Sequence, residues 1–193
     1  MNYQQAHELI QTGDLLSCAG PWTFSRLIRL MTKSDTSHVG IACWIQFNTE
    51  QRRLCIFEAI EGVGIRIQPL HFYLSTIFWP TGGKMWWSPL KSKEINGAGL
   101  MDFCLQAWGK GYVGPYQFIV AMLPLLQRIR KWLGKLLDTD KNKYHCAELV
   151  TAALMEQGYI HNKEPSFTTP GEVSKFSCWG PRILLENDYE MDQ

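Results

Sequence analysis

Cys146 is the residue of this sequence whose position most favours nucleophilic chemistry. It stands at the start of a helical pattern in which Cys146, Leu149, Val150 and Ala153 share one face, and Gly158 ends that pattern. At a helix start, unpaired backbone N–H groups and the positive end of the helix dipole favour a thiolate over a thiol. The same N–H groups stabilise an oxyanion that forms at an attacked carbonyl. The pattern predicts a reactive thiol, although a cysteine at a helix start is more often structural.

His38 and Glu58 have the residue types and positions of a base and an acid for this thiol. His38 opens an apolar run over 38–47 that is typical of a strand, and Glu58 interrupts an otherwise apolar row in the strand pattern of 54–60. A carboxylate in such a row needs a partner. An imidazole between a thiol and an acid takes the thiol proton while the acid fixes its tautomer. Spacing alone leaves open a satisfied core histidine and a salt-bridged glutamate.

Four further residues are rivals or helpers at this site. Glu61 is close to Glu58 in the sequence, but its odd spacing places it on the opposite face of a regular strand. His145 adjoins the thiol, yet consecutive helical positions diverge by about 100°, so it is poorly aimed as the base and better suited to line the cleft. Tyr144 and Tyr116 are able to donate a hydrogen bond to a substrate, although a tyrosine more often packs with a satisfied hydroxyl.

The elements that must position these side chains form a β-rich centre with helices at both ends. Strand patterns occur at 14–18, 38–47, 54–60, 62–67 and 84–89. Helical patterns occur at 23–31, 95–108 and from Cys146 onward, and Gly109 and Gly158 suit the ends of the last two. Thr169-Pro-Gly-Glu172 has the spacing of a capping box with proline at the first helical position. The order of elements predicts an α+β fold.

Composition places the chain among globular proteins of one domain. At 193 residues, a chain buries about 70% of the surface that its unfolded form exposes, which suits one core. The 46% hydrophobic and 19% charged residues exclude a disordered or collagen-like chain. Nineteen basic and 18 acidic residues leave a net charge of +1, so nucleic acid is not expected as a partner. We predict a single domain over 1–193.

The sequence has no pattern typical of a membrane span, a secretory signal or a zinc site. The longest uninterrupted apolar stretch, 118–126, contains Pro124 and is well short of the ~20 residues that cross a bilayer. The N-terminus does not have the pattern of a secretory signal, so the cytoplasm is expected and disulfides are not. Six cysteines at long intervals without a Cys-x-x-Cys pair offer no zinc site. Neither a metal nor an organic cofactor is predicted.

A basic amphipathic pattern lies within the segment 113–143. At about 100° per residue, one face over 125–137 is apolar and the other is basic. The apolar face includes Leu125, Ile129, Trp132 and Leu136, and the basic face has Arg128, Arg130, Lys131 and Lys135. Such a helix packs on its own core, docks on a partner or lies on an anionic membrane surface. Core packing is the commonest of the three, and peripheral membrane contact is an alternative.

Five short blocks of the sequence follow one another in a recognisable order. They are Gly13-Asp-Leu-Leu, Leu27-Ile-Arg-Leu-Met-Thr-Lys-Ser-Asp-Thr-Ser-His-Val-Gly-Ile, Phe57-Glu-Ala followed by Gly62-Val, Tyr144-His-Cys-Ala-Glu-Leu-Val, and Thr169-Pro-Gly-Glu-Val. In this order they resemble the circularly permuted NlpC-type papain-like cysteine hydrolases, and among them the YiiX-like group. The blocks extend from about residue 13 to residue 173.

The resemblance implies an antiparallel sheet packed against helices in a circularly permuted papain-like fold. It implies that His38 is the base, Glu58 the orienting acid and Cys146 the nucleophile. At the next position, Ala147 replaces the serine that relatives commonly have. The resemblance also marks 113–143 as an elaboration. The implied activity is cleavage of an amide or ester through an acyl-enzyme, with peptide-like substrates first. Lipid acyl hydrolysis or acyl transfer at a membrane surface, and non-catalytic binding of a peptide or lipid, are the alternatives.

Overall fold

A six-stranded antiparallel sheet forms the centre of the computed structural model, which describes residues 1–48, 51–91, 97–113 and 142–186. The strand order is β4-β3-β2-β1-β5-β8, and all neighbouring pairs are antiparallel. The strands are β1 (Leu15–Ala19), β2 (His38–Gln46), β3 (Arg52–Ile60), β4 (Gly64–Pro69), β5 (Lys84–Ser88) and β8 (Ile183–Leu185). A separate parallel pair joins β6 (Gly111–Tyr112) to β7 (Lys143–Tyr144).

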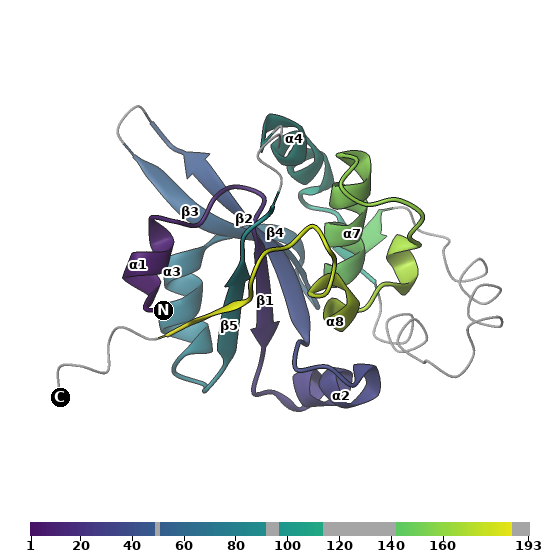
Figure 1. Ribbon diagram of the computed structural model, residues 1–193, viewed down its shortest axis with the longest axis horizontal. Coiled ribbons are helices and arrows are strands. Elements are labelled where there is room, and N and C mark those ends of the chain that lie inside the picture. The colour runs from purple at the N-terminus through teal and green to yellow at the C-terminus, as the bar shows by residue number, and fades with distance from the viewer. Residues whose placement is uncertain (49–50, 92–96, 114–141, 187–193) are drawn as a thin grey trace.

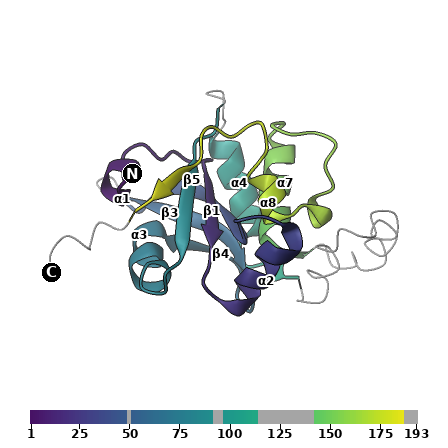
Figure 2. The same ribbon diagram turned by 60° about the horizontal axis from the view of Figure 1, so that its bottom comes forward.

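Helices cover both faces of this sheet (Figure 1). One face carries α1 (Tyr3–His7) and α3 (Leu70–Tyr73), which continues into the π-helical turn η1 (Leu74–Phe78). The other face carries α4 (Gly97–Ala107), α7 (Cys146–Glu156) and α8 (Pro170–Val173), with the 3-10 turn η3 (Pro165–Phe167) beside α7. The remaining helix, α2 (Thr23–Thr32), lies at one end of the sheet (Figure 2).

Alternation along the central strands produces two buried layers. In β2, Val39 and Ile41 belong to the layer that includes α4 and α7, whereas Ala42 belongs to the layer of α1 and α3. By the same alternation His38 and Glu58 lie on the α3 face, while Cys146 belongs to the α7 layer. Cys146 can therefore reach the other two side chains only past the start of β2, where His38 lies.

The predicted α+β character is confirmed, and most predicted elements occur within a few residues of their expected bounds. Gly109 and Gly158 have positive φ angles of 79° and 75°, in keeping with their expected places at the ends of α4 and α7. Thr169 and Glu172 form the predicted capping box, with Pro170 as the first helical residue.

The elements that the sequence did not predict include α1, β8 and the helical segment 70–78. Leu70, Tyr73, Leu74 and Phe78 have helical spacing and are all buried. The segment is rich in aromatic and β-branched residues, which have low intrinsic helix propensity, and its packing on β3 and β4 outweighs that preference.

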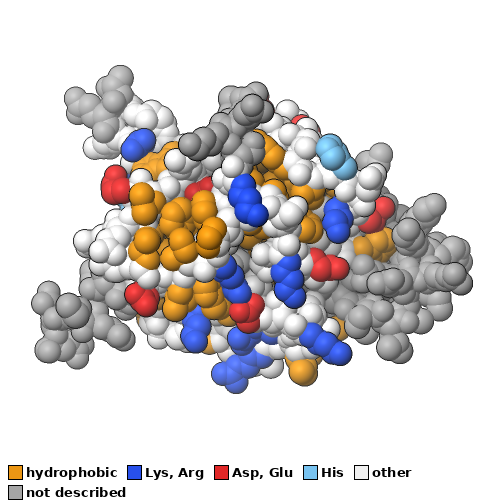
Figure 3. Space-filling view, viewed as in Figure 1, with side chains coloured by type: hydrophobic (Ala, Val, Ile, Leu, Met, Phe, Trp, Pro, Cys, Tyr) orange, Lys and Arg blue, Asp and Glu red, His pale blue; other side chains and the backbone are white. Residues whose placement is uncertain are grey.

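Part of the predicted elaboration at 113–143 lies outside the described residues, because those end at 113 and resume at 142. The amphipathic pattern of 125–137 and Tyr116 fall in this gap. In the part of the chain that the structure describes, no helix is long and apolar enough to cross a membrane. Figure 3 shows basic and acidic side chains interspersed around apolar areas on one face, as the small net charge leads one to expect.

Candidate active site

Cys146 is the first residue of α7, as predicted, and only 1% of its surface is exposed. The helix begins here because His145, in an extended conformation, acts as the N-cap. Its Nδ1 accepts a hydrogen bond from the Glu148 N–H at 3.2 Å, and the Glu148 carboxylate accepts one from the His145 N–H at 3.3 Å. This reciprocal capping box fixes the helix start and so the position of the thiol.

Glu58 is the centre of a buried chain of polar contacts. Its side chain is 0% exposed, and its Oε2 lies 2.8 Å from Nε2 of His38, the first residue of β2. Arg66 is the register partner of Glu58 in β4 and donates two hydrogen bonds to Oε1, from Nε at 3.0 Å and from Nη2 at 2.8 Å. The predicted need of this carboxylate for a partner is met twice, by an imidazole and by a guanidinium.

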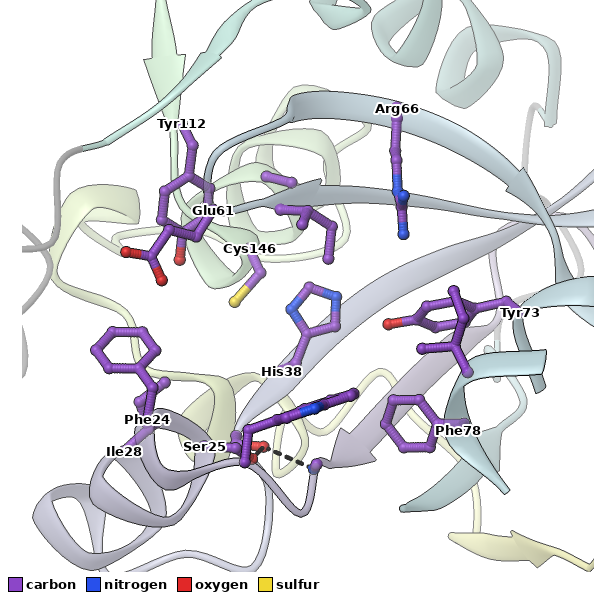
Figure 4. Close-up of a pocket in the computed structure, with 16 residues that line it drawn as sticks. Phe24, Ser25, Ile28, His38, Glu61, Arg66, Tyr73, Phe78, Tyr112 and Cys146 are labelled. Atoms are coloured by element: carbon purple, nitrogen blue, oxygen red, sulfur yellow. Dashed lines mark hydrogen bonds between the residues drawn. The ribbon is translucent and has the colours of Figure 1, made fainter. Parts of the chain in front are cut away.

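The thiol of Cys146 and the ring of His38 meet where β2 and α7 begin. Figure 4 shows the sulfur beside the imidazole, and each of the two groups shifts the pKa of the other. Since Nε2 of His38 faces Glu58, Nδ1 is the nitrogen left for the sulfur. The structure thus brings together all three residues that the sequence singled out, in the order sulfur, imidazole, carboxylate.

The charges of this cluster shift two pKa values in opposite directions. Burial by itself raises the pKa of Cys146, but the positive charge of His38 and the neighbouring imidazole of His145 lower it to about 6. Burial by itself lowers the pKa of His38, but the Cys146 thiolate and the Glu58 carboxylate raise it to about 10. Between about pH 6 and about pH 10, the pair is a thiolate and an imidazolium.

The pKa values of the other cysteines are shifted in the opposite direction to that of Cys146. All six are free and lie among the described residues. Burial raises the pKa of each of the five others, which are Cys18, Cys43, Cys55, Cys104 and Cys178. Near neutral pH, Cys146 is therefore the cysteine with thiolate character.

A pocket of about 330 Å³ opens beside the thiol and the imidazole (Figure 4). Its walls come from α2 and the loop before it, from the α3–η1 segment, from the ends of β3 and β6, and from β4. The apolar and aromatic residues that line it are Trp22, Phe24, Ile28, Ala59, Ile60, Tyr73, Ile77, Phe78 and Tyr112. Its lining also has the acidic and basic side chains of His38, Glu61 and Arg66.

The other residues that the sequence analysis considered for this site, Glu61, His145, Tyr144 and Tyr116, do not all line the pocket. Glu61 lies beyond the end of β3, in an exposed turn, and lines the pocket, so the rule for opposite faces of a regular strand does not apply to it. His145 is 2% exposed and caps α7. Tyr144 is paired in register with Tyr112; among the described residues that line the pocket, Tyr112 is present and Tyr144 is not. Tyr116 lies outside the described residues.

The sequence did not predict Arg66, the capping role of His145 or the aromatic walls of the pocket. Arg66 pairs with Glu58 through the register of β3 and β4, which a single sequence does not fix. A signal for the cap was present, because Glu148 follows His145 by three residues, although histidine is not among the preferred N-caps. Tyr73 and Phe78 were missed together with their helical segment.

The side chains of the cluster do not suit a metal ion. In the described part of the chain, no group of three or more histidine, cysteine, aspartate and glutamate side chains is arranged to hold one. The Glu58 oxygens already face Nε2 of His38 and the guanidinium of Arg66, and the neighbouring guanidinium charge opposes a cation at that carboxylate.

Fold and site together define a mixed α+β protein with an antiparallel sheet, in which a cysteine, a histidine and a glutamate meet near the starts of β2 and α7. The crystal structure of the metalloprotein yiiX from Escherichia coli O157:H7 is similar over 92% of this chain and 98% of that chain, with a TM-score of 0.63 and 16% sequence identity. The chain has a YiiX-like fold. No family model matches the sequence, and no curated protein matches it either.

Proposed function

We propose that this protein is a thiol-dependent hydrolase of the permuted papain-like, NlpC type, which cleaves an amide or ester bond through an acyl-enzyme. The observation that carries the proposal is the contact between the Cys146 thiol and the His38 ring, whose other nitrogen lies 2.8 Å from a fully buried Glu58. Nucleophile, base and orienting acid have these relative places in cysteine hydrolases. Their order along the chain, histidine then acid then cysteine, is the order that the resemblance implies.

In the first half of the reaction the Cys146 thiolate attacks the carbonyl carbon of the substrate. A C–S bond forms, and the oxyanion lies at the start of α7, where first-turn N–H groups such as that of Cys146 have no acceptor within the helix. His38 then transfers its proton to the leaving nitrogen or oxygen as the carbonyl bond to that atom breaks. The Glu58 carboxylate stabilises the imidazolium and holds its orientation.

In the second half, water releases the acyl group. His38, now neutral, takes a proton from water as the oxygen attacks the thioester carbon. The C–S bond breaks, the carboxylic acid leaves, and the thiolate and the imidazolium are restored. Another nucleophile in place of water would make the same site an acyltransferase.

Selective alkylation tests the proposal. With iodoacetamide at about pH 6.5, where an ordinary thiol is almost fully protonated, we expect Cys146 to be the main site of labelling, identified by peptide mass. The labelling rate should rise with pH through about 6. His38→Ala should slow it about tenfold near pH 6.5, because the loss of thiolate outweighs the higher nucleophilicity of a more basic thiol.

Two results would contradict this prediction. Cys178→Ser is the control, since Cys178 is the partly exposed cysteine and its substitution should leave the labelling of Cys146 unchanged. Equal labelling rates of Cys146 in the wild type and in His38→Ala would favour the non-catalytic binding module. Preferential labelling of another cysteine near neutral pH would remove the nucleophile from the proposal.

A further inference from the structure

We propose that Arg182 is a positioning residue for the proposed reaction, because it holds the loop that leads directly into His38. The loop is 33–37, between the end of α2 and the first residue of β2. The inference rests on the proposed function, since His38 is the base of that reaction. The observations that carry it are the pairing at the start of β2, the bonds and burial of the loop, and the contacts of Arg182.

The start of β2 is paired more fully with β1 than with β3. On the β1 side, the register extends to the first residue of the strand, where His38 pairs with Cys18. On the β3 side, the register begins three residues later, at Ile41, which pairs with Phe57. Strand ends with few partners open more easily than strand centres. The position of His38 therefore depends on what holds the loop before it.

The last residue of the loop is bonded to β1 and to α2. Ser37 is 3% exposed, and its N–H donates to the carbonyl of Cys18 at 2.8 Å. Its hydroxyl donates to the same carbonyl at 3.2 Å and accepts a hydrogen bond from Ser25 of α2 at 2.5 Å. These bonds hold the residue next to His38 from one side.

Arg182 holds the two residues that precede Ser37. It lies just before β8, the edge strand that pairs with β5 (Figures 1 and 2). Its Nη1 lies 2.5 Å from the Asp35 carboxylate, and its Nη2 donates to the Thr36 hydroxyl at 3.0 Å. Thr36 is 0% exposed, so the second bond is to a buried part of the loop. One guanidinium therefore connects the edge of the sheet to two successive residues of this loop.

The ring of Trp86 fixes the plane of this guanidinium. Cζ of Arg182 lies 3.8 Å from the ring centroid, within the range of a cation–π contact. Trp86 belongs to β5 and pairs in register with Leu184 of β8 and with Ser17 of β1. An exposed ion pair alone contributes little, and the side chain of Asp35 is 63% exposed. A guanidinium that is already stacked on the sheet loses less freedom when it bonds to the loop.

These contacts require the shape of arginine as well as its charge. Two nitrogens of the planar group bond to Asp35 and Thr36 while its face lies on Trp86, which the single ammonium of lysine does not reproduce. Burial by itself raises the pKa of Asp35, but the hydrogen bond and the charge of Arg182 lower it below its ordinary value. The carboxylate is therefore charged near neutral pH, and Arg182→Lys should loosen the loop as Arg182→Met does.

The pH profile of Cys146 alkylation by iodoacetamide tests the inference. When the loop loosens, the imidazolium is held less firmly beside the sulfur and stabilises the thiolate less, so the midpoint in Arg182→Met should rise by about one pH unit. The midpoint is the readout because a more basic thiolate is also more nucleophilic. Asp35→Asn should raise it too, and the double variant should be no higher than Arg182→Met, since Asp35 has then already lost its partner.

Arg52→Met is the matched control. The Arg52 guanidinium also lies over a tryptophan ring, with Cζ 4.4 Å from the centroid of Trp44, but Arg52 pairs with Gln46 at the opposite end of β2 from His38. It should leave the midpoint unchanged. A lower free energy of unfolding in Arg182→Met with the wild-type midpoint would restrict Arg182 to a structural role and overturn the inference. A wild-type midpoint in Arg182→Lys would also overturn it, because charge alone would then suffice.

NMR of the imidazole separates this inference from the reaction. The ring nitrogens of His38 report its titration without substrate or alkylating agent, and His38→Ala identifies their signals. We expect the midpoint of His38 to be lower in Arg182→Met than in the wild type and unchanged in Arg52→Met. The same His38 midpoint in Arg182→Met and the wild type would refute the inference and leave the proposed function standing. Equal labelling of Cys146 in the wild type and His38→Ala would refute the proposed function, and the His38 titration would still decide whether Arg182 positions the ring.

Discussion

Arg66 is the residue that gives Glu58 a counter-charge inside the protein. The carboxylate is completely buried, and its contacts to Arg66 and His38 compensate for the hydration that it loses. Arg66 itself is 25% exposed in its side chain, so water reaches part of the pair and weakens it. The register between β3 and β4 places this guanidinium, and it thereby supports the orientation of His38.

Replacing Arg66 by methionine should affect both stability and the thiol. We expect a loss of about 2 kcal/mol in the free energy of unfolding, less than for a fully buried pair, because Glu58 is left without a cation. The alkylation of Cys146 near neutral pH should also slow, because Glu58 without Arg66 no longer fixes the His38 ring. Denaturant unfolding and the pH profile of labelling measure the two effects.

Arg53→Met serves as the comparison for Arg66→Met, since Arg53 is exposed in β3 and its guanidinium lies over the Phe47 ring. It should change neither quantity beyond the usual effect of a surface substitution. A pH profile of labelling that is the same in Arg66→Met as in the wild type would restrict Arg66 to a structural role.

At the scale of elements, the start of α7 decides where the sulfur lies. The capping box between His145 and Glu148 fixes the first turn, and Ser166 from η3 donates to Glu148 at 2.9 Å, which holds the acidic half of the box. The imidazole of His145, next to Cys146, also helps to lower the pKa of the thiol. One histidine therefore both starts the helix and stabilises the thiolate.

Two substitutions separate these roles of His145. Asparagine is a good N-cap, so His145→Asn should retain the helix start while removing the imidazole, and the pH midpoint of Cys146 labelling should rise above about 6. His145→Ala loses the cap as well and should be less stable than His145→Asn by about 1 kcal/mol. Thermal or denaturant unfolding of both variants and their labelling profiles give the comparison. Equal stability of the two would show that the cap contributes little.

Helices and strands could be predicted from the sequence where neighbouring residues alone favour them. The strand beginning at His38 and the helices ending at Gly109 and Gly158 follow from periodicity and turn residues. The helical segment 70–78 was not predicted, because its aromatic and β-branched residues favour a helix only when they pack against the sheet. That segment supplies Tyr73, Ile77 and Phe78 to the pocket, so the walls were missed along with it.

At the scale of the whole molecule, the basic amphipathic pattern of 125–137 predicts peripheral contact with a membrane. If that contact exists, anionic vesicles should sediment the protein at low salt, and changing Arg128, Arg130, Lys131 and Lys135 to Glu should abolish it, because each basic residue near an anionic surface contributes about 1 kcal/mol. Neutral vesicles are the control. A protein that stays in solution with anionic vesicles would leave core packing or a protein partner as the role of this pattern.

The sequence by itself determined the chemical types of the site and the local elements that carry them. A cysteine at a helix start, a histidine at a strand start and a glutamate in an apolar row are properties of short stretches. Only the tertiary structure decided that the three side chains meet, that Arg66 joins them, and that aromatic side chains from two helical segments enclose a pocket beside the sulfur. The physical reason is that strand register, helix docking and cavity shape depend on contacts between residues far apart in the chain, and local periodicity does not specify which distant surfaces pack together.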